Sequence, residues 1–321
     1  MLVSIVVPCY NSERSIEQLV ELTIEEFKKI DGYECEFILV NDYSKDDTFS
    51  AIRRLTDKYS FVKGINFAKN FGQHNAVLAG LHYVSGDFVI GMDDDLQHHP
   101  NQIPLFIEKM EEGYDVVFGI YKQRKFSFIK NVYEKISHYL MWKILERPAG
   151  IEMSSFWMAR RYVTDKMTEF DGYNGFLQLL FFRTTHNMAN IEIEHHERAY
   201  GKSNYSFIKG LSLFISSINY TVIPLRIATF LGVIFSIAGF IGAIIVLIQK
   251  ILNPIVAIGW SSLMCAMLVL FGISFLMLGI IGEYIGKLIL NINKTPQFVV
   301  REAINVDLNK STVKEGDKSE N

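Results

Sequence analysis

Cysteine is scarce in this chain, because only Cys9, Cys35 and Cys265 occur among 321 residues. They form no spacing typical of a zinc site or a disulfide framework, which fits a reducing, cytoplasmic setting for the main domain. A large charge excess is also missing: the formal net charge is −3, which argues against a general nucleic-acid binder. We expect no secretory signal, since the apolar run before Pro8 is too short for one.

Apolar residues make up 49% of the sequence and are concentrated in its C-terminal third. Residues 227–248 form an uncharged run of about 22 residues and residues 255–282 one of about 28, each long enough to span a bilayer. A pair of buried core helices is the alternative, but two such lengths joined by a short polar link are hard to bury. We therefore expect two transmembrane helices that form a hairpin.

Positive charges flank this hairpin unequally. Arg226 precedes the first run, and Lys287, Lys294 and Arg301 follow the second, whereas the connecting loop carries only Lys250. The positive-inside rule places both ends of the hairpin, and the N-terminal domain with them, in the cytoplasm.

Strand-like and helix-like segments alternate before the hairpin. Strands are expected at residues 2–7, where Pro8 would end the first, and at 36–40, 62–67, 88–92 and 115–119. Helices are expected after Ser12 as a possible N-cap, from near Thr48, and at 75–84. This alternation predicts an α/β fold with a doubly wound, mostly parallel sheet.

Two later segments, residues 126–145 and 205–220, are amphipathic and rich in aromatic residues. Ordinary core helices are the alternative for both. For the second segment we favour an interfacial helix, because it leads directly into the first apolar run and is rich in Phe and Tyr.

Three consecutive aspartates, Asp93, Asp94 and Asp95, follow the apolar residues 88–92. A simple turn is the alternative, because aspartate favours turns. In open α/β sheets, however, ligands bind at the carboxyl ends of the strands. Crowded carboxylates there are best relieved by a divalent cation that prefers oxygen ligands. The triplet therefore predicts a metal ion, and a metal ion at this edge of the sheet predicts a bound phosphate.

Five segments in order together resemble glycosyltransferase family 2. They are VSIVVPCYNSE, ILVNDYSKDDT (similar to VDDGSxDxT), FAKNFGQHNAVLAG, GMDDDLQHHP (similar to MDADLQxPP), and GEYIGK followed by TPQFVV. Within the family the chain resembles the polyprenyl-phosphate glycosyltransferases, a group that includes dolichyl-phosphate mannose synthase, bactoprenol glucosyltransferases and aminoarabinose transferases.

This resemblance implies a GT-A-type sheet followed by interfacial amphipathic helices and a two-helix C-terminal transmembrane hairpin. The expected parts are a cytoplasmic GT-A catalytic domain at 1–204, an interfacial helix at 205–221, the two transmembrane helices within 222–288, and a cytoplasmic tail at 289–321. From Glu302 onward the tail is short, charged and polar, and we expect it to be disordered.

By the same resemblance, metal binding and catalysis fall to Asp93, Asp95 and Gln97, and the metal would be Mg²⁺ or Mn²⁺. Asp94 would be a bystander, since the family often has alanine there. Nucleotide binding is implied for Asp42, which would bind the base, and for the pocket residues Pro8, Tyr10 and Glu13. An Asx-turn role for Asp42 stays open beside this one.

The segment EHHERAYGKSNYSF, residues 194–207, resembles the family's lipid-phosphate segment. Arg198 offers a planar fork suited to phosphate, and Lys202 and Ser203 accompany it. Arg124 and Lys130 match positions where the family carries further phosphate-binding basic residues. A solvated basic loop is the alternative.

Ser155 stands where many relatives carry an aspartate proposed as the catalytic base, and Trp157 stands in place of an arginine. Both hint at an unusual or amino sugar. A phosphate monoester has its second pKa near about 6, so it is already anionic near neutral pH and proton abstraction is largely unnecessary. Positioning and metal charge can carry such a reaction.

These observations predict a membrane-anchored inverting glycosyltransferase. It would transfer a sugar from a nucleotide sugar, expected to be a UDP-sugar, to polyprenyl (undecaprenyl) phosphate at the cytoplasmic face, and would form a homo-oligomer. A processive polysaccharide synthase is one alternative, disfavoured by the absence of its Gln-x-x-Arg-Trp motif. A non-catalytic membrane scaffold is the other, supported only by the altered stretch 154–157.

Overall fold

The computed structural model describes residues 1–121, 148, 150–170, 172, 176–194, 259–292 and 296–306, and seven single positions between 230 and 252. The chain divides into two compact units. One consists of Met1–Asn204 and Pro296–Asn321, and the other of Tyr205–Thr295.

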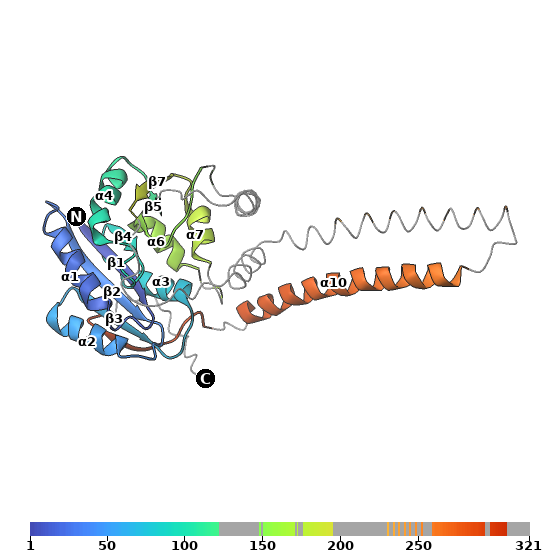
Figure 1. Ribbon diagram of the computed structural model, residues 1–321, viewed down its shortest axis with the longest axis horizontal. Helices are drawn as coiled ribbons and strands as arrows, with labels where there is room; N and C mark the ends of the chain where they lie inside the picture. The colour runs from blue at the N-terminus through green and yellow to red at the C-terminus, as the bar shows by residue number, and fades with distance from the viewer. Residues whose placement is uncertain are drawn as a thin grey trace, which may run out of the picture. The chain divides into compact units, whose positions relative to one another are not determined.

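An eight-stranded sheet forms the centre of the first unit (Figure 1), in the order β7-β5-β6-β4-β1-β2-β3-β8. The strands are β1 Leu2–Cys9, β2 Glu34–Asn41, β3 Val62–Phe67, β4 Phe88–Gly91, β5 Val116–Tyr121, β6 Trp157–Arg160, β7 Met188–Ile193 and β8 Val300–Ile304. Parallel pairs join β4, β1, β2 and β3, and also β5 with β7. The pairs that involve β6 and β8 are antiparallel. The expected α/β fold with a mostly parallel sheet is confirmed.

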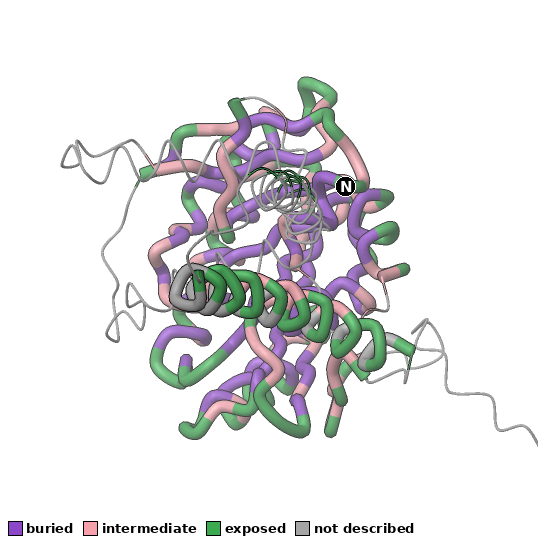
Figure 2. The backbone as a smooth tube through the Cα atoms, turned by 90° about the vertical axis from the view of Figure 1, so that its right-hand side faces the viewer, coloured by how far each residue is buried: buried purple, intermediate pink, exposed green. Residues whose placement is uncertain are grey.

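Helices cover both faces of this sheet. They are α1 Ile16–Phe27, α2 Thr48–Lys58, α3 Gln73–Leu81, α4 Ile103–Glu111, α6 Arg161–Thr168 and α7 Leu177–Thr184, with a short 3₁₀ turn at Pro100–Gln102. The core that α1, α2 and α4 share with one face contains alternate β1 residues such as Val3, Ile5 and Val7. On the other face α3 lies so close that a Cβ on Gly80 would meet Val6 at 2.5 Å. Figure 2 shows the resulting buried centre.

The first strand runs further than we predicted. Pro8 does not end it, because β1 continues through Pro8↔Val40 to Cys9↔Asn41. Its pairing with β4 stops at Val6↔Gly91. The end of β1 therefore has a neighbouring strand on one side only, where the absence of a proline N–H is tolerated. The expected cap was also wrong: α1 begins at Ile16 with Ser15 as N-cap, while the Ser12 hydroxyl bonds to Asp94.

Strand β6 enters the sheet between β4 and β5 and runs antiparallel to both. Its Trp157 is 1% exposed. The ring lies 4.8 Å from that of Phe181 and against Gly91, where a Cβ would be 2.3 Å from it. Trp157 is thus a core residue, and it gives no support to the idea that this position selects the sugar.

The expectation of disorder from Glu302 onward was wrong for the first residues of the tail. Strand β8 pairs with β3 along the sheet edge. Asn305 Nδ2 donates to the carbonyls of Thr56 at 2.9 Å and Val62 at 3.0 Å, and Arg53 forms a 2.7 Å ion pair with Glu302. Residues 307–321 lie outside the described part of the chain.

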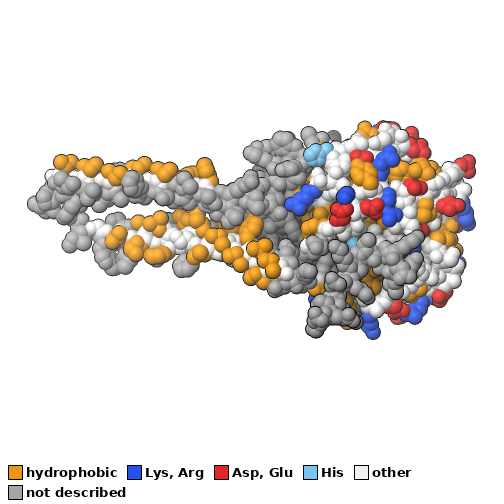
Figure 3. Space-filling view, turned by 180° about the vertical axis from the view of Figure 1, so that it is seen from behind, with side chains coloured by type: hydrophobic (Ala, Val, Ile, Leu, Met, Phe, Trp, Pro, Cys, Tyr) orange, Lys and Arg blue, Asp and Glu red, His pale blue; other side chains and the backbone are white. Residues whose placement is uncertain are grey.

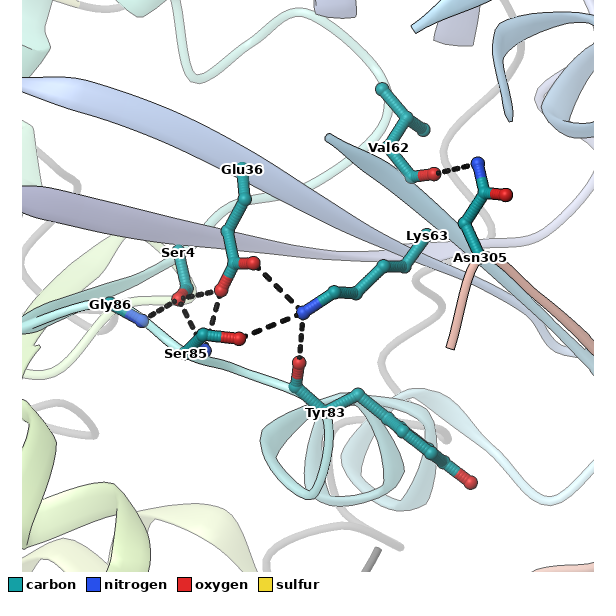
Figure 4. A network of polar contacts seen from close by, with 8 residues as sticks. All are labelled: Ser4, Glu36, Val62, Lys63, Tyr83, Ser85, Gly86 and Asn305. Atoms are coloured by element: carbon teal, nitrogen blue, oxygen red, sulfur yellow. Dashed lines mark hydrogen bonds and ion pairs between the residues drawn. The ribbon is translucent and has the colours of Figure 1, made fainter. Parts of the chain in front are cut away.

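A largely buried ion pair lies near the amino ends of the central strands (Figure 4). Lys63 Nζ donates to Glu36 Oε2 at 2.8 Å, to the Tyr83 carbonyl at 2.7 Å and to Ser85 Oγ at 2.9 Å. Glu36 Oε1 accepts from Ser4 Oγ at 2.6 Å and from the Ser85 N–H at 2.5 Å. Each charge has several partners, which is how a buried pair avoids a large desolvation penalty.

In the second unit, α10 spans Trp260–Ile292. It covers most of the predicted run 255–282 and continues ten residues past its end. Hydrophobic side chains lie along the helix (Figure 3), and Leu263, Leu278 and Ile292 are each at least 60% exposed. By length and hydropathy together, none of the helices in the described ranges qualifies as a membrane crossing. The predicted interfacial helix and most of the run 227–248 lie outside the described residues.

Candidate functional site

The loops after β1, β2 and β4 meet at one edge of the sheet, because these strands are parallel neighbours. The Tyr10 N–H, just after β1, donates to Asp94 Oδ2 after β4 at 3.0 Å. The Asn11 N–H donates at 3.0 Å to the hydroxyl of Ser44, which follows β2. The structure therefore joins the loops that carry the predicted nucleotide and metal residues.

Asp93 accepts hydrogen bonds on both carboxylate oxygens. Gln73 Nε2, in the first turn of α3, donates to Oδ1 at 2.6 Å. The Ser155 hydroxyl, just before β6, donates to Oδ2 at 2.6 Å. Two charge-assisted bonds of this length fix the direction of the carboxylate.

Asp94, for which the resemblance implied no role, connects the β4 turn to the β1 loop. Its Oδ2 accepts from the Tyr10 N–H at 3.0 Å and from the Ser12 hydroxyl. Burial raises the pKa of Asp94 to about 6, and the charges of Asp93 and Asp95 raise it too, although the two hydrogen bonds oppose the change. Asp94 thus bonds to the loop after β1, whereas Asp93 bonds to α3 and to the residues before β6.

The turn after the triplet is tight. Leu96 has a φ of 62°, and the Gln97 N–H donates to Asp95 Oδ1 at 3.1 Å. The Asp93 N–H donates to His98 Nδ1 at 3.1 Å, and the His98 ring stacks on Phe156 with centroids 4.9 Å apart. His98 is 4% exposed, so it supports the turn from beneath.

The donor types suit a hard divalent cation, because Asp93, Asp95 and Gln97 offer carboxylate and amide oxygens. In the described ranges, no three His, Cys, Asp or Glu side chains converge in a metal-binding arrangement. Asp93 and Asp94 bond to different partners, which agrees with this.

Asp42 is 4% exposed and bonds to the segment that follows β3. The N–H groups of Phe71 and Gly72 donate to Oδ1 at 2.7 Å and to Oδ2 at 2.9 Å. Burial raises the pKa of Asp42 and these two bonds oppose it. The Asx-type contact in this loop comes from Asn41 instead, whose Oδ1 accepts from the Ser44 N–H at 3.3 Å.

The other predicted pocket residues lie nearby in different environments. Pro8 is buried within β1, whereas Tyr10 and Glu13 are exposed. The Glu13 N–H donates to Asp46 Oδ2 at 3.2 Å, in the loop after β2. The predicted acceptor residues fall outside the described ranges; these are Arg124, Lys130, Arg198, Lys202 and Ser203.

Sequence reasoning missed Ser12, Gln73 and His98 as members of this site. Gln73 and His98 lay inside two of the quoted segments, FAKNFGQHNAVLAG and GMDDDLQHHP, and these polar residues next to the aspartates were the available signal. Ser12 was considered only as a helix cap.

Two family models match the sequence. Glycosyl transferase family 2 matches residues 4–168, and the GtrB C-terminal hairpin matches residues 223–288. The first match contains the sheet edge described above, and the second contains both long apolar runs.

Known proteins are similar to this chain over two thirds of its length or more. An undecaprenyl-phosphate 4-deoxy-4-formamido-L-arabinose transferase from Proteus mirabilis is 31% identical, over 95% of this chain and 94% of its own. Glucosyl-3-phosphoglycerate synthase from Mycobacterium tuberculosis, solved with uridine diphosphate, has a TM-score of 0.51 at 20% identity, over 68% of this chain and 78% of that chain. The same enzyme solved with Mn²⁺ and UDP-glucose has a TM-score of 0.49 at 20% identity, over 68% and 76% of the respective chains.

Proposed function

Because the chain belongs to glycosyl transferase family 2, we propose that it transfers a sugar from a nucleotide sugar to undecaprenyl phosphate. The observation that carries this proposal is the similarity to the Proteus mirabilis transferase, which extends through the catalytic domain and the hairpin region alike. A processive synthase and a non-catalytic scaffold fit this full-length similarity less well.

The donor would bind at the carboxyl edge of β1, β2 and β4. Asp42 would accept a hydrogen bond from the base, since each carboxylate oxygen has a second lone pair beside the one used by Phe71 or Gly72. Tyr10 and Glu13, exposed on the neighbouring loop, would border the nucleotide, and Pro8 would form the floor beneath them. We expect a UDP-sugar.

Mg²⁺ or Mn²⁺ would be bound by Asp93, Asp95 and Gln97, and would neutralise charge on the departing nucleoside diphosphate. Gln73 and Ser155 support this by fixing the direction of Asp93. Ser155 donates a hydrogen bond to Asp93, so it is a poor candidate for a base. The acceptor phosphate is anionic near neutral pH, and its oxygen would attack the anomeric carbon directly, with inversion, as the nucleoside diphosphate leaves.

The acceptor phosphate would be bound by Arg198, Lys202 and Ser203, with Arg124 and Lys130 adding positive charge. Sequence supports this placement, because residues 194–207 run into the amphipathic segment 205–220 that leads into the hairpin. We further propose that the hairpin anchors the protein in the plasma membrane, with the catalytic domain and both termini on the cytoplasmic side. A homo-oligomer remains a prediction.

One experiment tests the proposal as a whole. Purified full-length protein is incubated with undecaprenyl phosphate, Mg²⁺ and a panel of nucleotide sugars, and the lipid product is weighed by mass spectrometry. Nucleotide-activated 4-deoxy-4-formamido-L-arabinose belongs first in the panel because of the relative's activity. We expect a lipid heavier by one sugar and an equal amount of nucleoside diphosphate. Absence of any lipid product together with absence of metal-dependent donor binding would favour the scaffold.

A further inference from the structure

The segment that follows α10 packs in the same unit as the catalytic sheet. Within it, the Phe298 ring stacks on Phe67 with centroids 5.7 Å apart and planes 13° apart. The same ring lies 5.8 Å from the His82 ring. Phe67 is the last residue of β3, and His82 directly follows α3. One side chain from the far end of the sequence therefore contacts both ends of the segment 67–82.

That segment carries three of the contacts that shape the candidate site. The N–H groups of Phe71 and Gly72 donate to the two oxygens of Asp42, and Gln73 donates to Asp93. The rings of Phe67 and Phe71 meet edge to face at 5.4 Å. A continuous set of contacts therefore runs from Phe298 to the Asp42 carboxylate.

The residues between β3 and α3 have little regular structure of their own. Gly72 has a φ of 88°, and a side chain would strain the backbone there. The Ala68 N–H donates to the Val299 carbonyl at 3.0 Å, and the β3–β8 ladder shifts register at Asn66 and Phe67. The start of this connection is thus paired with the segment after α10, and its position depends on that segment.

We propose that Phe298 is a positioning residue for nucleotide-sugar binding. Its ring fixes the segment 67–82, so that Phe71 and Gly72 direct the Asp42 carboxylate toward the base. This inference rests on the proposed function, since it takes the ligand of Asp42 to be a nucleotide. It assigns the residues after the hairpin a part in the donor site, although Phe298 lies more than 200 residues from Asp42 and Asp93 in the sequence.

The test uses purified full-length protein with UDP as the binding probe. Phe298→Ala should weaken UDP binding in calorimetry about threefold to tenfold, as expected when one aromatic pair is lost. The KM for the nucleotide sugar should rise by the same factor, while kcat and the KM for undecaprenyl phosphate stay unchanged. Phe298→Leu should have a UDP affinity between those of the parental protein and Phe298→Ala, because leucine keeps part of the contact with Phe67. Arg301→Ala, an exposed position of β8, is the matched control and should leave UDP binding as it was.

A double variant separates positioning from simple stabilisation. If Phe298 acts through Asp42, Asp42→Asn combined with Phe298→Ala should weaken UDP binding less than the sum of the two single changes. Parental UDP affinity in Phe298→Ala, with only a lower thermal midpoint, would overturn the inference. If that variant does not fold, Phe298→Leu decides, and parental affinity there overturns it equally. Failure of the parent to bind UDP or transfer sugar would instead refute the proposed function.

Discussion

The Ser155 hydroxyl donates a 2.6 Å hydrogen bond to Asp93 Oδ2. By the resemblance, Ser155 stands where a catalytic aspartate was expected. Its hydroxyl instead supports the carboxylate of Asp93. Asp93 receives its second bond from Gln73 on the opposite oxygen. The altered stretch 154–157 is therefore weak support for a non-catalytic scaffold, because its Ser155 bonds to a candidate metal ligand.

Replacing Ser155 by aspartate should lower activity rather than restore a base. A second carboxylate so close to Asp93 would repel it and displace it from its present direction. We expect Ser155→Asp to weaken Mn²⁺ binding, followed by electron paramagnetic resonance, by about tenfold, or roughly 1.4 kcal/mol. Ser155→Ala removes one bond without adding charge and should cost less. A gain in turnover with Ser155→Asp would show that this position does supply a base.

Asp95→Asn should abolish metal-dependent turnover with little loss of folding. The change keeps the size of the side chain but removes one of the two carboxylates assigned to the cation. Turnover with and without Mg²⁺ and the thermal midpoint are the two measurements. Asp57→Asn, an exposed position of α2, serves as control. Full activity of Asp95→Asn with Mg²⁺ present would end the metal assignment.

The sheet could be predicted because its strands are apolar runs with turn residues at their ends, and β3 was placed at its observed bounds. Strands β6, β7 and β8 were not predicted, because each mixes apolar and polar residues over only four to six positions, which is too little periodicity to show pairing with distant partners. The same limit applies to the site. Asp93 was identifiable from its neighbours, whereas its partners Gln73 and Ser155 lie 20 and 62 residues away in the sequence.

Glu36→Gln should destabilise the catalytic domain and flatten its pH dependence. Burial raises the pKa of Glu36, but hydrogen bonds from Lys63, Ser4 and Ser85 and the charge of Lys63 outweigh it, so the pKa lies below its ordinary value of 4.5. A carboxyl whose pKa is lower in the folded state than in the unfolded state stabilises the fold. This stability is fully present above the unfolded-state pKa and is lost as the pH falls through the folded-state pKa. The parental protein should therefore lose stability below about pH 4.5 more steeply than the variant.

At neutral pH this variant leaves the largely buried charge of Lys63 without its carboxylate partner. We expect a loss of about 3–5 kcal/mol in the free energy of unfolding, measured by denaturant titration. Glu21→Gln is the matched control, because it removes an exposed ion pair with Lys58 and should cost less than about 1 kcal/mol. Equal losses of unfolding free energy in the two variants would mean that burial of the Glu36–Lys63 pair adds nothing to stability.

The orientation of the hairpin can be tested with reporters. A reporter fused after Lys310 should be cytoplasmic, and one inserted at Asn253 should be on the opposite side of the membrane. The basis is the charge asymmetry, since the loop carries only Lys250 while Arg226 and Lys287 flank the two runs. Finding both reporters on one side would exclude a hairpin of two crossings.

Arg198→Ala should raise the KM for undecaprenyl phosphate and leave that for the nucleotide sugar almost unchanged. Arg198 lies outside the described residues, so the basis is sequence: it follows the nucleotide segments and directly precedes the amphipathic segment that leads into the hairpin. A charged hydrogen bond of this kind contributes about 1.5–3 kcal/mol, or roughly tenfold to a hundredfold in KM. Arg198→Lys should restore only part of the loss, because a point charge replaces a bidentate fork.

Arg183→Ala, an exposed position of α7, is the control and should change neither KM. Steady-state kinetics with each substrate varied in turn decide the matter, and a defect confined to the nucleotide-sugar KM would assign Arg198 to the donor diphosphate instead.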